Sequence, residues 1–259
     1  MSSHKLVSAA FVTTALLAAC SSASGPSGSG RSVAFQMATQ KGTPAPSGTA
    51  LLSGQEILAA GSDTIVVSSV QFVLRKIELE RAVASPVCDS LNPSHDDCEE
   101  LKAGPVLLDL PLGTGASRSF SVAVDTGSYK KIQLQIHKPS STDDASFLAA
   151  NPGFDGVSIK MTGSYNGTPF TYVTDLEAEQ EFEFNPPLAV SDSTGASLTL
   201  FVDLATWFAN GSVSSPGLLD PATALKGGPN ESLVKQAIQT SLHAFEDEDH
   251  NGGDDHHGN

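Results

Sequence analysis

Short runs in which apolar and polar residues alternate fill most of the chain between residues 64 and 204. Successive side chains of a β-strand point to opposite faces, so a period of two predicts half-buried strands. A shorter candidate precedes these runs at residues 33–38. The eight main runs lie at residues 64–80, 106–108, 120–124, 132–136, 157–161, 170–173, 182–184 and 198–204.

Two places in this pattern predict local geometry. The apolar phase shifts by one residue between Leu74 and Ile77, which predicts a β-bulge around Arg75 and Lys76. Asn166-Gly167 separates two alternating runs, and this dipeptide is a strong signal for a two-residue hairpin turn.

The fold class follows from how the runs are connected. Turns rich in Gly, Pro, Asn and Asp join them, without the crossover helices that a parallel α/β sheet requires. We therefore predict an all-β fold, an antiparallel β-sandwich of about eight strands, with one C-terminal helix. Together they occupy residues 32–245. Asn230 can cap the helix, which covers a sheet edge or an end of the sandwich. Its apolar face comprises Val234, Ala237, Ile238, Leu242 and Phe245.

The N-terminus predicts export. Lys5 precedes an apolar run at residues 6–17, which is too short to span a bilayer but suits a signal peptide. The run ends in Leu17-Ala18-Ala19-Cys20, which resembles a bacterial lipobox. The resemblance implies that residues 1–19 are removed as a signal peptide and that Cys20 is lipidated. An ordinary secretory signal with an incidental Cys20 is the alternative.

The residues after Cys20 predict where the domain is held. Ser21 directly follows the cysteine, and lipobox proteins with a small neutral residue there usually reach the outer membrane. Residues 20–31 combine the lipidated cysteine with a flexible Ser- and Gly-rich tether, whose first ten residues span about 16–19 Å. We expect an outer-membrane protein held by its lipid, facing the periplasm or the cell surface.

Export changes the interpretation of the other two cysteines. Cys88 and Cys98 bracket a polar loop, and thiols in an oxidising compartment tend to pair. We predict a disulfide, which stabilises the chain by about 3 kcal/mol for a loop of this length. A metal site that also uses His95 is the alternative, although the CxxC spacing typical of zinc sites is missing.

The last residues, 246–259, form an acidic and His-rich tail. Its pattern resembles the first nine positions of an EF-hand calcium loop, which implies a Ca²⁺ site. The ligands would be Asp247, Asp249, Asn251, Gly253 and Asp255. Position twelve is Gly258 where the EF-hand has a bidentate Glu. Two alternatives remain: transition-metal binding through the tail histidines, or a solvated acidic tail.

Composition narrows the partners. The chain has 14 basic and 29 acidic residues and a formal net charge of −15. Nucleic-acid binding requires Lys and Arg concentrated on one face, so this charge argues against it. Six of the acidic residues lie between Glu246 and Asp255, which concentrates part of the negative charge in the tail.

The stretch Gly-Ser-Tyr-Lys-Lys-Ile-Gln-Leu-Gln-Ile at residues 127–136 resembles the strand entry of transthyretin-like and carboxypeptidase-regulatory-like sandwiches of exported bacterial lipoproteins. The resemblance implies a sandwich and carries no catalytic residue across.

The sequence favours a structural or binding role over catalysis. G-x-S-x-G, H-E-x-x-H and P-loop motifs do not occur after the signal peptide, so no catalytic residue is assigned and we predict no enzyme. The predicted function is that of an outer-membrane-anchored lipoprotein at the cell envelope. One alternative is an envelope hydrolase whose triad is assembled from distant strands, with His137 as a candidate base. Another is an accessory subunit that pairs an exposed strand with an envelope protein partner.

Overall fold

The computed structural model describes residues 32–39, 54–82, 104–113, 117–191, 195–212 and 215–246, which form thirteen strands and two α-helices. The strands are β1 (Ser32–Ala38), β2 (Glu56–Ala60), β3 (Asp63–Arg81), β4 (Val106–Asp109), β5 (Ser117–Ala123), β6 (Gly127–Ile136), β7 (Ile159–Tyr165), β8 (Thr168–Thr174), β9 (Ala178–Val190), β10 (Ala196–Val202), β11 (Ala209–Ser212), β12 (Ser215–Leu218) and β13 (Leu242–Glu246). The helices are α2 (Ala145–Ala150) and α3 (Glu231–Thr240).

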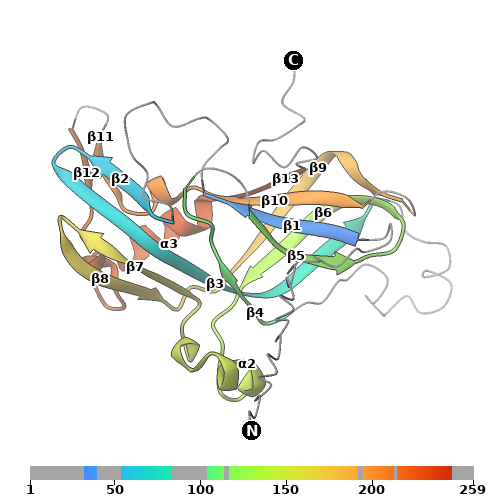
Figure 1. The fold of residues 1–259 in the computed structure, drawn as a ribbon, viewed down its shortest axis with the longest axis horizontal. Helices are drawn as coiled ribbons and strands as arrows, with labels where there is room; N and C mark the ends of the chain where they lie inside the picture. The colour runs from blue at the N-terminus through green and yellow to red at the C-terminus, as the bar shows by residue number, and fades with distance from the viewer. Residues whose placement is uncertain are drawn as a thin grey trace, which may run out of the picture.

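The strands form two main sheets that face each other. One has the order β13-β10-β1-β5, and the other has the order β8-β7-β3-β6-β9, with β2 and β4 also paired to β3. A small hairpin of β11 and β12 is separate from both. Figure 1 shows β1, β5 and β10 in one layer, with β3, β6 and β9 in the other. A single hydrophobic cluster joins the two layers, so the predicted all-β sandwich is confirmed.

Strand β3 organises the larger sheet. Its first half pairs with β2 and β7, and its second half pairs with β6. The partner strand changes from β7 to β6 at Val73. Its N–H donates to the Ser158 carbonyl at 2.8 Å, and its carbonyl accepts from the His137 N–H at 2.9 Å. The end of β6 and the start of β7 therefore meet on one edge of β3.

The core between the sheets is made of the inward-facing side chains of strands in which apolar and polar residues alternate. Phe35 and Met37 of β1 belong to the same buried cluster as Ile77 of β3 and Leu134 of β6. Trp207 is 1 % exposed, packs edge-on against Phe72 with ring centroids 5.7 Å apart, and donates its indole N–H to Ser241 Oγ at 2.8 Å. Burial of these large apolar surfaces provides the main driving force for folding.

The connection from β6 to β7 forms a second, smaller cluster on the outer face of β3. Val73 is fully buried there against Phe147 of α2 and Phe154 of the short 3₁₀ helix Pro152–Phe154. Figure 1 shows α2 projecting beyond the sheets at this point. The connection thus covers an apolar residue that would otherwise face solvent, and it fixes the residues that follow β6.

Both local predictions for the strands are confirmed. The pairing of β3 with β6 shifts register between Leu74 and Lys76, which places a bulge at Arg75. Asn166 and Gly167 both have positive φ, 48° and 82°, as a type I′ hairpin turn requires.

The C-terminal helix is shorter than its apolar spacing predicts. It ends at Thr240, and Leu242–Glu246 form β13, which pairs antiparallel with β10. Leu242 and Phe245 therefore belong to a strand, since pairing with β10 outweighs their helical spacing. The side chain of Asn230 makes no capping hydrogen bond and donates to Thr223 Oγ1 at 2.9 Å.

Two further features differ from the expected pattern. Strand β9 continues through Pro186 and Pro187 to Val190, because it is an edge strand and its register shifts there, so the prolines need not donate to the ladder. Strands β1 and β10 pair in parallel, although all other pairs are antiparallel among the described strands.

Helix α3 is joined to the end of β8 by ion pairs at Asp175. Lys226 and Lys235 donate to its two carboxylate oxygens at 2.8 and 2.7 Å. Lys235 also contacts Glu231 one helical turn away at 2.6 Å. The hydrogen bonds from Lys226 and Lys235 hold the pKa of Asp175 well below its ordinary value.

We expect Asp175→Asn to lower the free energy of unfolding by about 1 kcal/mol at neutral pH. The value is small because Lys226 is largely exposed and solvent screens its ion pair with Asp175. A lowered folded-state pKa contributes stability that is present above the unfolded pKa of 3.8 and is lost as the pH falls through the folded value. Urea unfolding should therefore show the variant and the native chain converging below pH 4. Asp155→Asn, at an exposed position, serves as the control. An unchanged difference at pH 3 would contradict this role for Asp175.

Candidate ligand-binding cleft

A cleft of about 420 Å³ opens where β3 bulges. It lies between β3, β6, the segment before β4, and the turn that precedes α2. Its lining residues are Arg75, Lys76, Gly104, Pro105, Gln135, Asp143 and Asp144. The cleft therefore has basic, acidic and amide groups on its walls.

Arg75 is the extra residue of the bulge. Leu74 pairs with Ile136 and Lys76 pairs with Gln135, so Arg75 has no partner in β6. Bulges re-aim a side chain, and they are frequent beside functional sites. The backbone here is also closely packed, because a Cβ on Gly104 would lie 1.7 Å from the Arg75 carbonyl oxygen.

The two cations of this wall differ in their contacts. Lys76 forms an ion pair with Glu78. The exposed Arg75 forms neither a hydrogen bond nor an ion pair with the part of the chain that the structure describes. Its charge helps to lower the pKa of Asp144, but its N–H donors are available to a ligand.

The acidic wall is fixed by the turn after β6. Ser140 Oγ donates to Asp143 Oδ2 at 2.9 Å and accepts from the Asp143 N–H at 3.2 Å. Ser140 and Asp143 thus exchange two hydrogen bonds within the turn. The Asp144 N–H also donates to the Ser140 carbonyl at 2.9 Å. Both carboxylates are therefore held in place before a ligand arrives.

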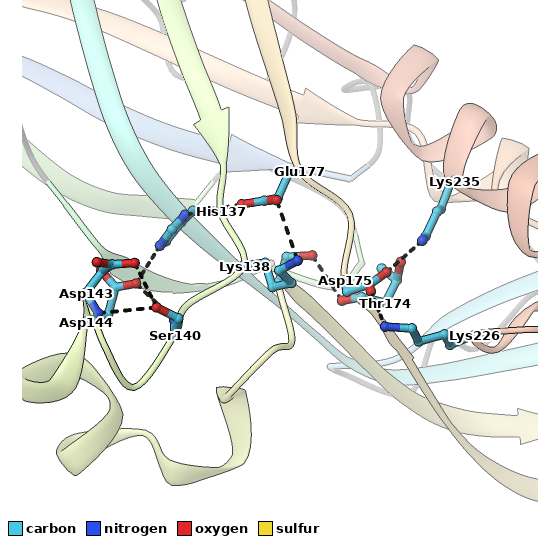
Figure 2. Close-up of polar contacts among 11 residues, drawn as sticks. His137, Lys138, Ser140, Asp143, Asp144, Thr174, Asp175, Glu177, Lys226 and Lys235 are labelled. Atoms are coloured by element: carbon cyan, nitrogen blue, oxygen red, sulfur yellow. Dashed lines mark hydrogen bonds and ion pairs between the residues drawn. The ribbon is translucent and has the colours of Figure 1, made fainter.

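A hydrogen bond with His137 fixes the side chain of Asp144. Both side chains are buried, and His137 Nε2 lies 2.7 Å from Asp144 Oδ2, which also accepts from the Ser140 N–H at 3.1 Å (Figure 2). Burial acts to raise the pKa of Asp144, but the hydrogen bonds from His137 and Ser140 outweigh it and the pKa lies below its ordinary value. An ionised carboxylate only accepts hydrogen bonds, so Nε2 carries the proton.

The other nitrogen of the ring points away from Asp144. His137 Nδ1 lies 4.0 Å from Glu177 Oε1, and Lys138 Nζ lies 3.6 Å from Glu177 Oε2, as Figure 2 shows. A Ser–His–Asp triad would need a hydroxyl at Nδ1. Within the described segments, the group recorded beside Nδ1 is the Glu177 carboxylate, and Ser140 Oγ is bonded to Asp143.

The residues assigned to sites from sequence are not among those that the structure describes. Cys20, Cys88 and Cys98 lie outside the described residues, as do the tail residues Asp247, Asp249, Asn251, Gly253 and Asp255. Among residues that the structure does describe, no three His, Cys, Asp or Glu side chains gather as a metal site would require. The same residues include no helix of sufficient length and hydrophobicity to cross a bilayer.

Sequence patterns contained two signals for this cleft. The phase slip located the bulge, and a bulged Arg has no partner strand residue to neutralise it. The series Ser140-Ser-Thr-Asp143 after a strand end is a capping pattern, although the juxtaposition with Arg75 depends on the paths of β3 and β6. No protein-family model matches this chain, and neither does any curated protein or solved structure.

Proposed function

We propose that this chain is a lipid-anchored protein of the cell envelope whose β-sandwich binds a small polar ligand in the cleft beside Arg75. One observation carries the binding role: a bulge presents a guanidinium that makes no hydrogen bond or ion pair with the described residues to a cleft that two fixed carboxylates also line. The volume lies within the range of about 300–1,000 Å³ common for small-molecule sites. Preorganised polar walls reduce the entropic cost of binding.

Ligand-dependent thermal stability tests this role. We would use the intact lipoprotein in detergent micelles with amino acids, wall-derived peptides, sugars and inorganic phosphate as probes. A ligand that binds only the folded state raises the unfolding temperature. We expect at least one class to do so, and Arg75→Ala to abolish the effect while Lys130→Ala, which removes a cation outside the cleft, preserves it. Failure of every class would overturn the binding role.

The location rests on the lipobox-like residues that end in Cys20. The tether after Cys20 leads directly to β1, an inner strand of the smaller sheet, which suits a folded domain suspended from its anchor. A Cys88–Cys98 disulfide belongs to the same proposal, because an exported chain folds in an oxidising compartment.

We expect Cys20→Ser to abolish lipid labelling and move the protein from the outer-membrane fraction to the soluble fraction of a host with two membranes. Cys88→Ser is the matched control and should remain membrane-bound. Retention of Cys20→Ser in the membrane would contradict lipid anchoring.

A calcium site in the tail is a separate part of the proposal, supported by the spacing of Asp247, Asp249 and Asn251. Strand β13 ends at Glu246, immediately before these residues. Calorimetry of the intact lipoprotein with Ca²⁺ should show weak binding, in the millimolar range typical of incomplete extracellular sites, that is lost in an Asp247→Asn, Asp249→Asn variant. Identical isotherms for both proteins would remove the tail site.

The Asp144–His137 contact is the observation behind hydrolysis as a second candidate function, because a carboxylate orients histidine bases in this way, although the other ring nitrogen faces Glu177 and not a hydroxyl. An active-site-directed phosphonate would label a serine in the native lipoprotein and lose that labelling in His137→Ala. Absence of labelling in the native protein would argue against a serine hydrolase.

A further inference from the structure

The charges in the cleft identify a ligand class, if the cleft is the binding site proposed above. We infer that it recognises a zwitterionic amino-acid group, with an ammonium and a carboxylate on the same carbon. The carboxylate would lie on Arg75 and the ammonium on Asp143 and Asp144.

The basic wall suits a carboxylate. A guanidinium presents N–H donors in a planar fork that matches the two oxygens of a carboxylate. The N–H donors of Arg75 make no hydrogen bond with the described residues, although its charge acts on Asp144, whereas Lys76 is paired with Glu78. Gln135, which pairs with Lys76 across the strands, adds an amide to the same surface.

The acidic wall suits an ammonium. The hydrogen bonds that hold the two carboxylates all use Oδ2: Ser140 Oγ donates to Asp143, and His137 Nε2 and the Ser140 N–H donate to Asp144. Oδ1 of each carboxylate accepts no hydrogen bond from the described residues. An ammonium has three donors, and two neighbouring carboxylate oxygens can accept from it.

The negative net charge of the protein favours a zwitterion over a simple anion, and Arg75 disfavours a simple cation. A net charge of −15 repels a free anion, so Arg75 alone would have to attract it. A simple cation would be repelled by Arg75 and would leave its N–H donors unused. A zwitterion is neutral overall and satisfies both walls, which is why we choose it over either ion.

Two sources supply this chemistry at an envelope. One is a free amino acid. The other is a cell-wall peptide that ends in a diamino acid, whose free end carries both charges on one carbon. Ordinary protein chains separate their terminal ammonium and carboxylate, so they do not present this group.

Calorimetry of the intact lipoprotein in micelles tests the inference with alanine, N-acetylalanine and alaninamide. Losing one charged hydrogen-bonded contact weakens binding by about tenfold or more, so alanine should bind at least tenfold more tightly than either blocked form. Arg75→Ala and Asp143→Asn should each weaken alanine binding by a similar factor. Lys130→Ala and Asp155→Asn, at positions outside the cleft lining, should not.

The outcomes separate this inference from the proposed function. Equal binding of alanine and N-acetylalanine would overturn the zwitterion and leave a cleft that binds anions. Stabilisation by sugars or phosphate alone, lost in Arg75→Ala, would also overturn the zwitterion and leave a cleft that binds another polar ligand. If no probe binds, both proposals fail. Tighter binding of a diamino-acid wall peptide than of alanine supports the inference and identifies the wall as the source, and equal binding supports it with a free amino acid.

Discussion

Replacement of Trp207 by alanine is expected to lower the free energy of unfolding by about 3–5 kcal/mol, the range for removing a large aromatic side chain from a core. Trp207 is 1 % exposed, packs edge-on against Phe72, and donates a hydrogen bond to Ser241, which follows α3. The substitution therefore weakens the contact of β3 with the C-terminal segment. Urea unfolding followed by circular dichroism measures the change, since the chain has a single tryptophan and fluorescence would be lost.

Two further variants make this prediction specific. Trp207→Phe retains an aromatic ring beside Phe72 and loses the hydrogen bond, so it should cost less than the alanine change. Leu233→Ala removes an apolar side chain that is 50 % exposed on α3 and should change stability by no more than about 0.5 kcal/mol. Equal losses for Trp207→Ala and Leu233→Ala would contradict the assignment of Trp207 to the core.

Replacement of His137 by alanine is expected to cost about 2–3 kcal/mol, because it leaves the buried Asp144 carboxylate without its strongest side-chain donor. The lowered pKa of Asp144 contributes stability above its unfolded value of 3.8, and that stability is lost as the pH falls through the folded value. The difference between the native chain and His137→Ala should therefore narrow below about pH 4.

A double-mutant cycle separates this contact from general packing. His137→Ala and Asp144→Ala together should cost clearly less than the sum of the single changes, since each alone leaves the other partner buried and unsatisfied. His243→Ala, at an exposed position on β13, should have little effect. Strictly additive losses for His137 and Asp144 would contradict an energetic coupling between them.

Local patterns in the sequence predicted those parts of the fold that local chemistry determines. The slip between Leu74 and Ile77 located the bulge, because the side-chain period of a strand must restart after an extra residue. Asn166-Gly167 located a hairpin because both residues tolerate positive φ.

The elements that the sequence did not predict depend on pairing between strands that are distant in the chain. Strand β2 has Glu56 buried and Ile57 40 % exposed, so its polarity pattern points the wrong way. Strand β13 continues the apolar spacing of α3, and only pairing with β10 makes it a strand. The parallel pairing of β1 and β10 joins residues about 160 positions apart, which no local pattern indicates.

The same distinction applies to the candidate site. The sequence predicted the bulge, and with it an unusual Arg75, but gave no sign that Asp143 and Asp144 would face it. That juxtaposition arises because β6 leaves β3 at Val73 and the following turn folds back over the outer face of β3. Val73 is an apolar residue between Gln71 and Arg75 on that face, and it was a local sign that this part of the face is covered.

Amide chemical-shift mapping of the intact lipoprotein, titrated with alanine in micelles, tests most directly whether the bulge at Arg75 forms the ligand site. We predict shifts concentrated at Arg75, Gln135, Asp143 and Asp144, saturating with ligand and absent in Arg75→Ala. Shifts that map elsewhere, or that persist unchanged in Arg75→Ala, would contradict the assignment of this cleft as the binding site.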